Sequence, residues 1–252
     1  MSVAVAQARQ SYFICCLPRS GSWLLADALR STGRAGRPEE FYWDAFRASY
    51  LKRWGEPKVE SFADFLELTF VDGTTPNGVF GAKLHWGELE QLGEALAELG
   101  PPDATLPDLL RRHFPEPSFV HLRRTDVVRQ AISWWRALRS SSWYRVSGES
   151  LAPDARVTPD WRDVFVLEQH LRDGERRWRA FFDGLHAPVL ELSYEDLVED
   201  YDGVVSSVLD FLGVALDAPL APPRLMRQRD DLTEQWTVAY VEARRALLSG
   251  VT

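Results

Sequence analysis

The feature that most constrains the fold is a set of four short apolar runs separated by longer amphipathic stretches. The first and third runs are almost continuously apolar, which is typical of central strands covered on both faces of a parallel sheet. This alternation of strands and helices predicts an α/β fold with a central, mainly parallel sheet flanked by helices. The runs cover residues 12–17, 79–84, 119–122 and 189–192, and we expect helices near 22–32, 60–71, 87–99, 126–143, 160–183, 201–212 and 231–247.

No shift in composition divides the 252 residues, so we predict a single domain over 1–252. Proline-rich segments near 101–107, 152–159 and 217–223 are predicted to be surface connections. A chain of this length can bury a sizeable core. With 45% hydrophobic residues and no repeats, the composition excludes intrinsic disorder, collagen and coiled coils.

The chain is acidic, with 29 basic and 37 acidic residues and a net charge of −8. This balance argues against nucleic acid or an anionic membrane as a partner, because proteins that bind them carry a basic surface. No apolar run approaches the ~18–20 residues that cross a bilayer, and the first residues lack the pattern of a secretory signal. Cys15 and Cys16 are neighbours that would point to opposite faces of a strand, so a disulfide between them is disfavoured. We therefore expect a reduced, cytoplasmic protein.

The loop after the first run, LPRSGSWLL, has the composition of an anion-binding turn. Pro18 and Gly21 permit a tight turn, and Ser20 and Ser22 can cap the helix that follows. The backbone N–H groups and dipole of a helix N-terminus attract phosphate-like anions, and Arg19 adds a permanent cation. The loop lacks the lysine and the spacing of a Walker A motif. Taken alone, it could equally be an ordinary capped turn.

A second basic element begins where the third predicted strand ends, at Arg123 and Arg124. In the helix that follows, Arg129, Ser133 and Arg136 share one polar face. An arginine at the strand end and a serine about two turns into the helix can converge on one phosphate, although a solvated basic face is the alternative. The carboxyl ends of parallel strands form the usual ligand crevice of such sheets, so the two elements together predict one anion site.

These elements resemble the 5′- and 3′-phosphate-binding elements of sulfotransferases that use 3′-phosphoadenosine 5′-phosphosulfate (PAPS). More narrowly, the chain is similar to the bacterial trehalose 2-sulfotransferase family. The resemblance implies a P-loop-like sulfotransferase fold and sulfuryl transfer to a hydroxyl, with 3′-phosphoadenosine 5′-phosphate (PAP) as product and no metal. The acceptor implied is a sugar or glycosylated metabolite, with a trehalose-like sugar as first choice. The resembling segments are RSGS (19–22), GRAGRPEEFYW (33–43), VFGAKLHW (79–86), HLRRTDVVRQAISWWRA (121–137), WRAFF (178–182), LSYEDL (192–197) and RLMRQRDDLTEQW (224–236).

The resemblance also implies roles for individual residues. It assigns Arg19 to the 5′-phosphosulfate and the leaving phosphate, and Glu40 to the general base that takes the acceptor proton. The implied cofactor contacts are Pro18, Arg19, Ser20, Gly21, Ser22 and Trp23 in the loop, Ser133 with Arg124 or Arg123 at the 3′-phosphate, and Arg227 with Gln228. Two departures stand out: Trp23 replaces the family's usual threonine, and nine residues separate Arg124 from Ser133 where the wider sulfotransferase pattern has eight.

The acceptor side is less certain from residues alone. Lys83 and His85 share one face of the second predicted strand and lie at its end, where a substrate could bind, so they are candidate acceptor contacts. Glu39, Trp43 and Trp86 are further candidates, the tryptophans because aromatic faces suit sugar rings. A strand-end lysine and a satisfied core histidine are the alternatives. An extended segment would send Glu39 and Glu40 to opposite sides, and aromatic residues 41–43 could desolvate the site-facing glutamate and raise its pKa.

Two other functions stay open at this point. Because Trp23 replaces the family's usual threonine, a non-catalytic pseudo-enzyme that binds PAP or PAPS is one alternative. A nucleotide-dependent kinase is the other, and the missing P-loop lysine disfavours it. Acceptor contacts are expected in residues 41–78 and 139–160, whose specificity the sequence does not reveal. A homodimer is raised by the resemblance only. In any of these cases, an acidic chain must concentrate its arginines in one crevice to hold a small polyanion.

Overall fold

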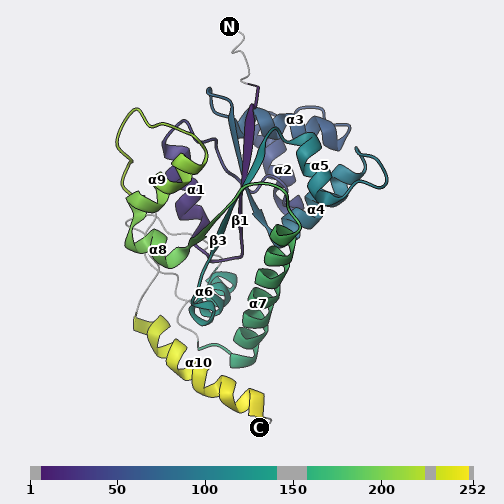
Figure 1. Ribbon diagram of the computed structural model, residues 1–252. Helices are drawn as coiled ribbons and strands as arrows, with labels where there is room; N and C mark the ends of the chain where they lie inside the picture. The colour runs from purple at the N-terminus through teal and green to yellow at the C-terminus, as the bar shows by residue number, and fades with distance from the viewer. Residues whose placement is uncertain (1–6, 141–157, 225–230, 250–252) are drawn as a thin grey trace.

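The computed structural model describes residues 7–140, 158–224 and 231–249. At its centre lies a four-stranded sheet in the order β2-β1-β3-β4 (Figure 1). Each neighbouring pair is parallel, which confirms the predicted α/β architecture. The strands are β1 (Gln10–Cys16), β2 (Val79–His85), β3 (Pro117–Arg123) and β4 (Val189–Ser193).

Helices cover both faces of the sheet, which explains why the strands are almost continuously apolar. On one face, Tyr12 and Ile14 of β1 pack with α1 (Ser22–Ser31), α8 (Tyr194–Glu199) and α9 (Tyr201–Phe211). On the other face, Phe13 and Cys15 belong to a larger core built with the remaining helices (Figure 1). These are α2 (Asp44–Arg53), α3 (Phe62–Gly73), α4 (Trp86–Ala97), α5 (Leu106–His113), α6 (Val127–Ser140), α7 (Trp161–Asp183) and α10 (Asp231–Ser249).

Three helices, α2, α5 and α8, were absent from the prediction, and α5 overturns part of a predicted connection. The α5 helix begins inside 101–107, where the Thr105 hydroxyl accepts from the Asp108 N–H and Pro107 lies in the first turn. Proline is tolerated there because the N–H it lacks has no partner inside the helix. The segment 217–223 is an irregular surface connection, as predicted.

The two cysteines lie on opposite faces of β1 and both thiols are free, as expected. Within the described ranges, no helix combines the length and the apolar character needed to cross a bilayer. The four strands end at one edge of the sheet, where Cys16 is paired in register with His85 and Leu122, and Arg123 with Ser193. Pro18, Arg19, Ser20 and Gly21 lie in the loop that leads from this edge into α1, and Arg124 lies in the one that leads into α6, whereas β2 and β4 run directly into α4 and α8.

Candidate functional site

The loop between β1 and α1 forms the tight turn that the sequence predicts. Arg19 and Gly21 both have left-handed backbone conformations, with φ of 65° and 83°. A side chain at Gly21 would place its Cβ 2.5 Å from the Tyr194 ring, so glycine is required by space as well as by conformation. The expected serine cap is wrong: Gly21 occupies the N-cap position without a side-chain cap. Ser20 is instead fully buried, and its hydroxyl has no hydrogen-bond partner among the described residues.

Three arginines from different elements meet beside this loop. The Arg19 Nε donates to the Ser133 hydroxyl of α6 at 3.0 Å. Arg124 donates to the Arg19 carbonyl at 3.4 Å and lies 4.6 Å over the Tyr194 ring. Arg136 is buried and donates to a threonine hydroxyl of α10. Burial lowers the pKa of Arg19 to about 10, and the charges of Arg124 and Arg136 add to this effect. The site therefore concentrates positive charge, and a bound anion would reduce the repulsion between these guanidinium groups.

The structure thus brings Arg19, Arg124 and Ser133 together, and it distinguishes Arg124 from Arg123, the last residue of β3. Arg123 pairs in register with Ser193 inside the sheet, whereas Arg124 is the one that bonds to the loop. The Pro18 carbonyl accepts from Gln130 at 2.8 Å, which ties the loop to α6. Arg227 and Gln228 lie outside the described residues.

Arg136 and Tyr194 also reach this site and were not predicted from the sequence. Both had a signal: Arg136 shares the polar helix face with Ser133, and Tyr194 lies in the LSYEDL segment.

A second cluster lies next to the loop and centres on Glu40. The fully buried Lys83 forms an ion pair with the Glu40 carboxylate. His85 Nε2 lies 3.1 Å from the same carboxylate oxygen. Lys83 Nζ also reaches the Ser22 hydroxyl at 3.5 Å and lies 4.6 Å over the Trp23 ring. Lys83 therefore links the carboxylate directly to the anion-binding loop.

The expected rise in the pKa of Glu40 is wrong in direction. Burial by itself raises that pKa, but the Lys83 ammonium and the His85 ring outweigh burial and hold the pKa at about 2. Desolvation by the flanking aromatic residues was the only influence visible in the local sequence. Glu40 is consequently ionised at neutral pH.

Two residues that the sequence analysis did not assign complete this cluster. Cys16 presents its carbonyl oxygen and its thiol to His85 Nδ1, at 3.3 and 3.6 Å. Burial lowers the pKa of His85. The negative charge of an ionised Cys16 and the hydrogen bonds from the His85 ring to Cys16 and Glu40 raise that pKa and outweigh burial. Glu88 is fully buried in the first turn of α4 and accepts from the His85 N–H at 3.1 Å. Its signal in the sequence is the spacing of a helix-capping glutamate three residues after His85.

The environment of Glu88 differs sharply from that of Glu40. Its Oε1 has no hydrogen-bond partner in the part of the chain that the structure describes, and burial raises its pKa to about 8. Glu40, His85 and Glu88 offer possible metal-ligand atoms that lie within 4.8 Å of one another. The Lys83 ammonium already supplies a positive charge to this group, and a cation beside it would be repelled.

Of the remaining predicted acceptor residues, only Trp43 lies beside the Glu40 cluster. Glu39 points away from Glu40, as the extended segment predicts, and pairs with Arg30 at 2.6 Å instead of joining the site. Trp86 packs into the core, with its ring 5.1 Å from that of Trp178. Trp43 is 39% exposed, and its ring lies 6.4 Å from that of His85. Trp43 is thus the exposed member of this pair and the one that lies beside His85.

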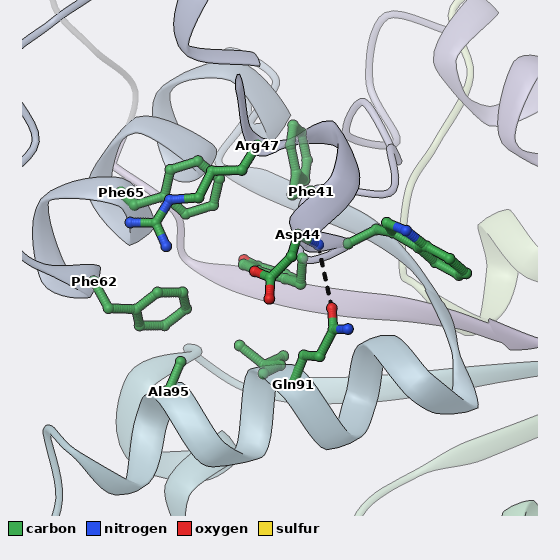
Figure 2. Close-up of a pocket in the computed structure, with 10 residues that line it drawn as sticks. Phe41, Asp44, Arg47, Phe62, Phe65, Gln91 and Ala95 are labelled. Carbon is green, nitrogen blue, oxygen red and sulfur yellow. Dashed lines mark hydrogen bonds between the residues drawn. The ribbon is translucent and has the colours of Figure 1, made fainter. Parts of the chain in front are cut away.

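Trp43 also lines a cleft, whose other walls Figure 2 shows. It lies between the segment that follows Glu40, the helices α2 and α3, and the middle and second half of α4. Its volume is about 300 Å³, which includes the part open to solvent. The cleft is lined by Phe41, Tyr42, Trp43, Asp44, Arg47, Phe62, Phe65, Gln91, Leu92 and Ala95.

The chain is similar to known proteins over most of its length. Residues 11–243 match the sequence profile of the family described as Stf0 sulphotransferase. The trehalose 2-sulfotransferase of Mycobacterium tuberculosis is 31% identical over 265 residues, with 94% of this chain and 96% of that protein covered. The enzyme of the same name from Mycolicibacterium smegmatis is 32% identical, with 91% and 94% covered. A sulfotransferase crystal structure from Alicyclobacillus acidocaldarius has 17% identity, a TM-score of 0.50 and 96% of each chain covered, which supports the fold.

Proposed function

Because the chain belongs to the Stf0 sulphotransferase family, we propose that it transfers a sulfuryl group from PAPS to a hydroxyl of a sugar or glycosylated metabolite. The observation that carries the proposal is the position of Lys83, which contacts both Ser22 of the loop and Glu40. A donor anion on the loop and a hydroxyl at Glu40 would therefore be neighbours. The similarity to two trehalose 2-sulfotransferases supports a sugar such as trehalose as the acceptor class.

The residues beside the loop fit a donor with several negative charges. The buried Ser20 hydroxyl has no partner among the described residues, and burial lowers the pKa of Arg19 and of Arg124. An anion would satisfy the hydroxyl and favour both charged guanidinium groups. Arg19 with residues 18–23 would hold the phosphosulfate end, and Arg124 with Ser133 would hold the 3′-phosphate.

Transfer in this site depends on position and charge. Sulfuryl transfer resembles phosphoryl transfer, in which the attacking and leaving oxygens lie in line and charge builds on the leaving group. The acceptor oxygen forms a bond to sulfur, the bond from sulfur to the phosphate oxygen breaks, and PAP leaves. Glu40 accepts the hydroxyl proton, while Arg19 and the N-terminus of α1 stabilise the charge on the leaving phosphate.

The proposal is tested by incubating the purified chain with sulfur-labelled PAPS and either trehalose or methyl glucoside. A metabolite extract of the native source, analysed by mass spectrometry for products heavier by one sulfate group, extends the search for the acceptor. We expect sulfated product without added magnesium. Glu40→Gln lowers kcat by about 10²–10⁴ while PAP affinity is retained, and the exposed Glu90→Gln serves as the matched control. Full activity in Glu40→Gln removes that residue as the base.

Trp23 favours one alternative, because its ring covers Lys83 where the resembling family usually has a threonine. A non-catalytic protein that binds PAP would bind the nucleotide tightly and transfer sulfate to no hydroxyl in a broad acceptor screen. We also infer a cytoplasmic location, which the two free thiols support. A homodimer stays a prediction, to be checked by measuring the mass of the protein in solution.

A further inference from the structure

Glu39 lies outside the site, and donors from two helices hold its carboxylate there. Its side chain is 13% exposed. Arg30 of α1 donates to Glu39 Oε1 at 2.6 Å and also to the Pro38 carbonyl at 3.1 Å. From α2, Arg53 donates to Oε1 at 3.5 Å, and the Tyr50 hydroxyl donates to Oε2 at 3.4 Å. Because α1 and α2 cover opposite faces of the sheet, Glu39 connects the two helical layers.

The backbone that carries Glu39 lies along β2, an edge strand of the sheet. The approach is close, since a side chain at Gly36 would place its Cβ 2.6 Å from the Gly81 nitrogen. The Lys83 N–H donates to the Glu39 carbonyl at 2.8 Å. The Lys83 ammonium pairs with the Glu40 carboxylate. One residue of β2 therefore holds both the backbone of Glu39 and the side chain of Glu40.

The helix α1 connects this segment with the anion-binding loop. Arg30 lies in the last turn of α1, so its bond to Glu39 attaches the segment to the C-terminal end of the helix. At the other end, Ser22 is the first residue of α1, and its hydroxyl lies 3.5 Å from Lys83 Nζ. The segment that carries Glu40 is thus joined to α1 near both ends of the helix. These contacts together set the position of Glu40 relative to the loop.

The donors that α2 directs at Glu39 are held by partners of their own. Arg53 pairs with Asp72 of α3, and its guanidinium lies 4.8 Å over the Tyr50 ring. The Trp54 Nε1–H, just after α2, donates to the Asp72 carboxylate at 3.0 Å. Tyr50 is buried in α2. The carboxylate of Glu39 therefore meets donors that are already fixed in place.

Positioning of this kind matters for the proposed transfer. The attacking hydroxyl has to lie in line with the bond that breaks, and the base has to stay within hydrogen-bond reach of the proton that it takes. A misplacement of about 1 Å can cost about 10²-fold in rate. Glu39 bears on this geometry because its backbone leads directly into Glu40, while its own carboxylate faces Arg30 and α2.

We propose that Glu39 is a positioning residue: by tying its segment to Arg30 of α1, it fixes Glu40 relative to the anion-binding loop and touches neither substrate. The inference rests on the proposed function, in which Glu40 takes the acceptor proton. It gives Glu39 a role different from the acceptor contact that was predicted from the sequence.

The first test compares Glu39→Gln in the unchanged protein and in the Glu40→Gln variant, with transfer from labelled PAPS to trehalose as the readout. In the unchanged protein, we expect kcat to fall by about 10–100-fold, while PAP affinity and the KM for the acceptor stay within about twofold. In Glu40→Gln, the same substitution should change kcat by less than about twofold, because Glu39 acts through Glu40. Equal losses in both backgrounds, or no loss in the unchanged protein, overturn the inference.

Two further variants serve as control and as second probe. Glu60→Gln is the matched control and keeps kcat, since Glu60 is exposed and pairs with Lys58. Arg30→Met breaks the proposed contact from the other side, so its loss and that of the double variant with Glu39→Gln should agree within about threefold. A double variant whose loss is the product of the two single losses overturns the shared contact. Should Glu39→Gln lose PAP binding and therefore its fold, Arg30→Met is compared in the two backgrounds in its place.

An NMR titration without substrates separates this inference from the proposed function. The Glu40 carboxyl of the unchanged protein should not titrate between about pH 3 and 7, because its pKa is about 2. Glu39→Gln removes a negative charge, which by itself lowers the pKa of Glu40, so a rise reports displacement of Glu40 from Lys83. A titration step in this range in Glu39→Gln supports the inference even where the chain transfers no sulfate, a result that would contradict the proposed function alone. A profile without such a step overturns the positioning role, whatever the transfer assay shows.

Discussion

The two clusters at the carboxyl edge of the sheet handle buried charge in opposite ways. Beside the loop, Arg19, Arg124 and Arg136 bring like charges together in a buried position. Around Glu40, the carboxylate meets Lys83 and His85, so opposite charges compensate one another. The pKa of Arg19 and the pKa of Glu40 are both lowered, yet the first shift disfavours the charged form and the second favours it.

This difference indicates which cluster needs a ligand. Burial and neighbouring positive charges disfavour the charged forms of these arginines. A bound anion would stabilise those charged forms, so the arginine cluster is suited to binding an anion. The Glu40 cluster is assembled in advance by groups of the protein itself. The net charge of −8 therefore describes the whole surface and not the site. The expected concentration of arginines beside the loop is confirmed for Arg19 and Arg124.

The largest expected effect comes from breaking the arginine cluster. Arg19→Met should lower kcat/KM by about 10³, because it removes a cation placed at the charge that develops on the leaving phosphate. The measurement is transfer from labelled PAPS. Arg177→Met is the control, since Arg177 lies exposed on α7 and pairs with Glu90. A decrease in kcat/KM of less than tenfold would contradict a role for Arg19 in stabilising the leaving phosphate.

Breaking the balanced cluster should change its pH dependence. Lys83→Met removes the group that most lowers the pKa of Glu40, so the pKa should rise to about 4.3 or above. A fall in kcat/KM below that pH should appear, where the unchanged enzyme stays flat because Glu40 ionises near pH 2. Lys83→Arg keeps the charge and should keep the flat profile. An unshifted profile in Lys83→Met would contradict the assigned electrostatics.

The arginine cluster can be resolved into its members by nucleotide affinity. Arg124→Met should weaken PAP binding by about 10–100-fold, the loss of one or two charge-assisted hydrogen bonds. Arg123→Met should have a clearly smaller effect, because Arg124 is the residue that bonds to the loop. Calorimetric titration with PAP decides between them, and the opposite ranking would reassign the 3′-phosphate contact.

Glu88 permits a test of the balanced cluster through stability. Its pKa is raised to about 8, so between about pH 4.3 and 8 the unfolded chain releases a proton that the folded protein keeps. Ionisation therefore favours the unfolded state as the pH rises through this window. Glu88→Gln removes the effect, so its Tm relative to the unchanged protein should rise by at least about 2 °C from pH 5 to pH 8. A difference in Tm that is constant with pH would contradict a protonated Glu88.

The smallest expected effect concerns metal. Incubation with EDTA should leave the transfer rate unchanged, because Lys83 supplies the positive charge beside Glu40 that an ion would otherwise provide. The control is the same assay with magnesium restored. If EDTA abolishes activity and added magnesium restores it, the prediction is wrong, and Glu40, His85 and Glu88 become the candidate metal ligands.

Local patterns account for which elements were predicted and which were missed. The four strands and the turn at Gly21 were predicted because apolar runs and glycine act locally. The α5 and α8 helices had signals that were passed over, namely Thr105 with Asp108 and Ser193 with Asp196, both capping pairs. The α2 helix has little amphipathic pattern, and only Tyr50 within it is buried. Its helical state depends on packing that a local pattern does not contain.

By itself, the sequence determined the α/β architecture, the tight turn at Gly21 and the divergence of Glu39 from Glu40. These follow from backbone periodicity and from residues adjacent in the chain. Only the tertiary structure decided that Glu40 meets Lys83, 43 residues away, and that Arg124 and not Arg123 reaches the loop. A pKa is set by charges and solvent within a few ångströms, whatever their separation along the chain. The direction of the Glu40 shift could therefore not be read from its aromatic neighbours.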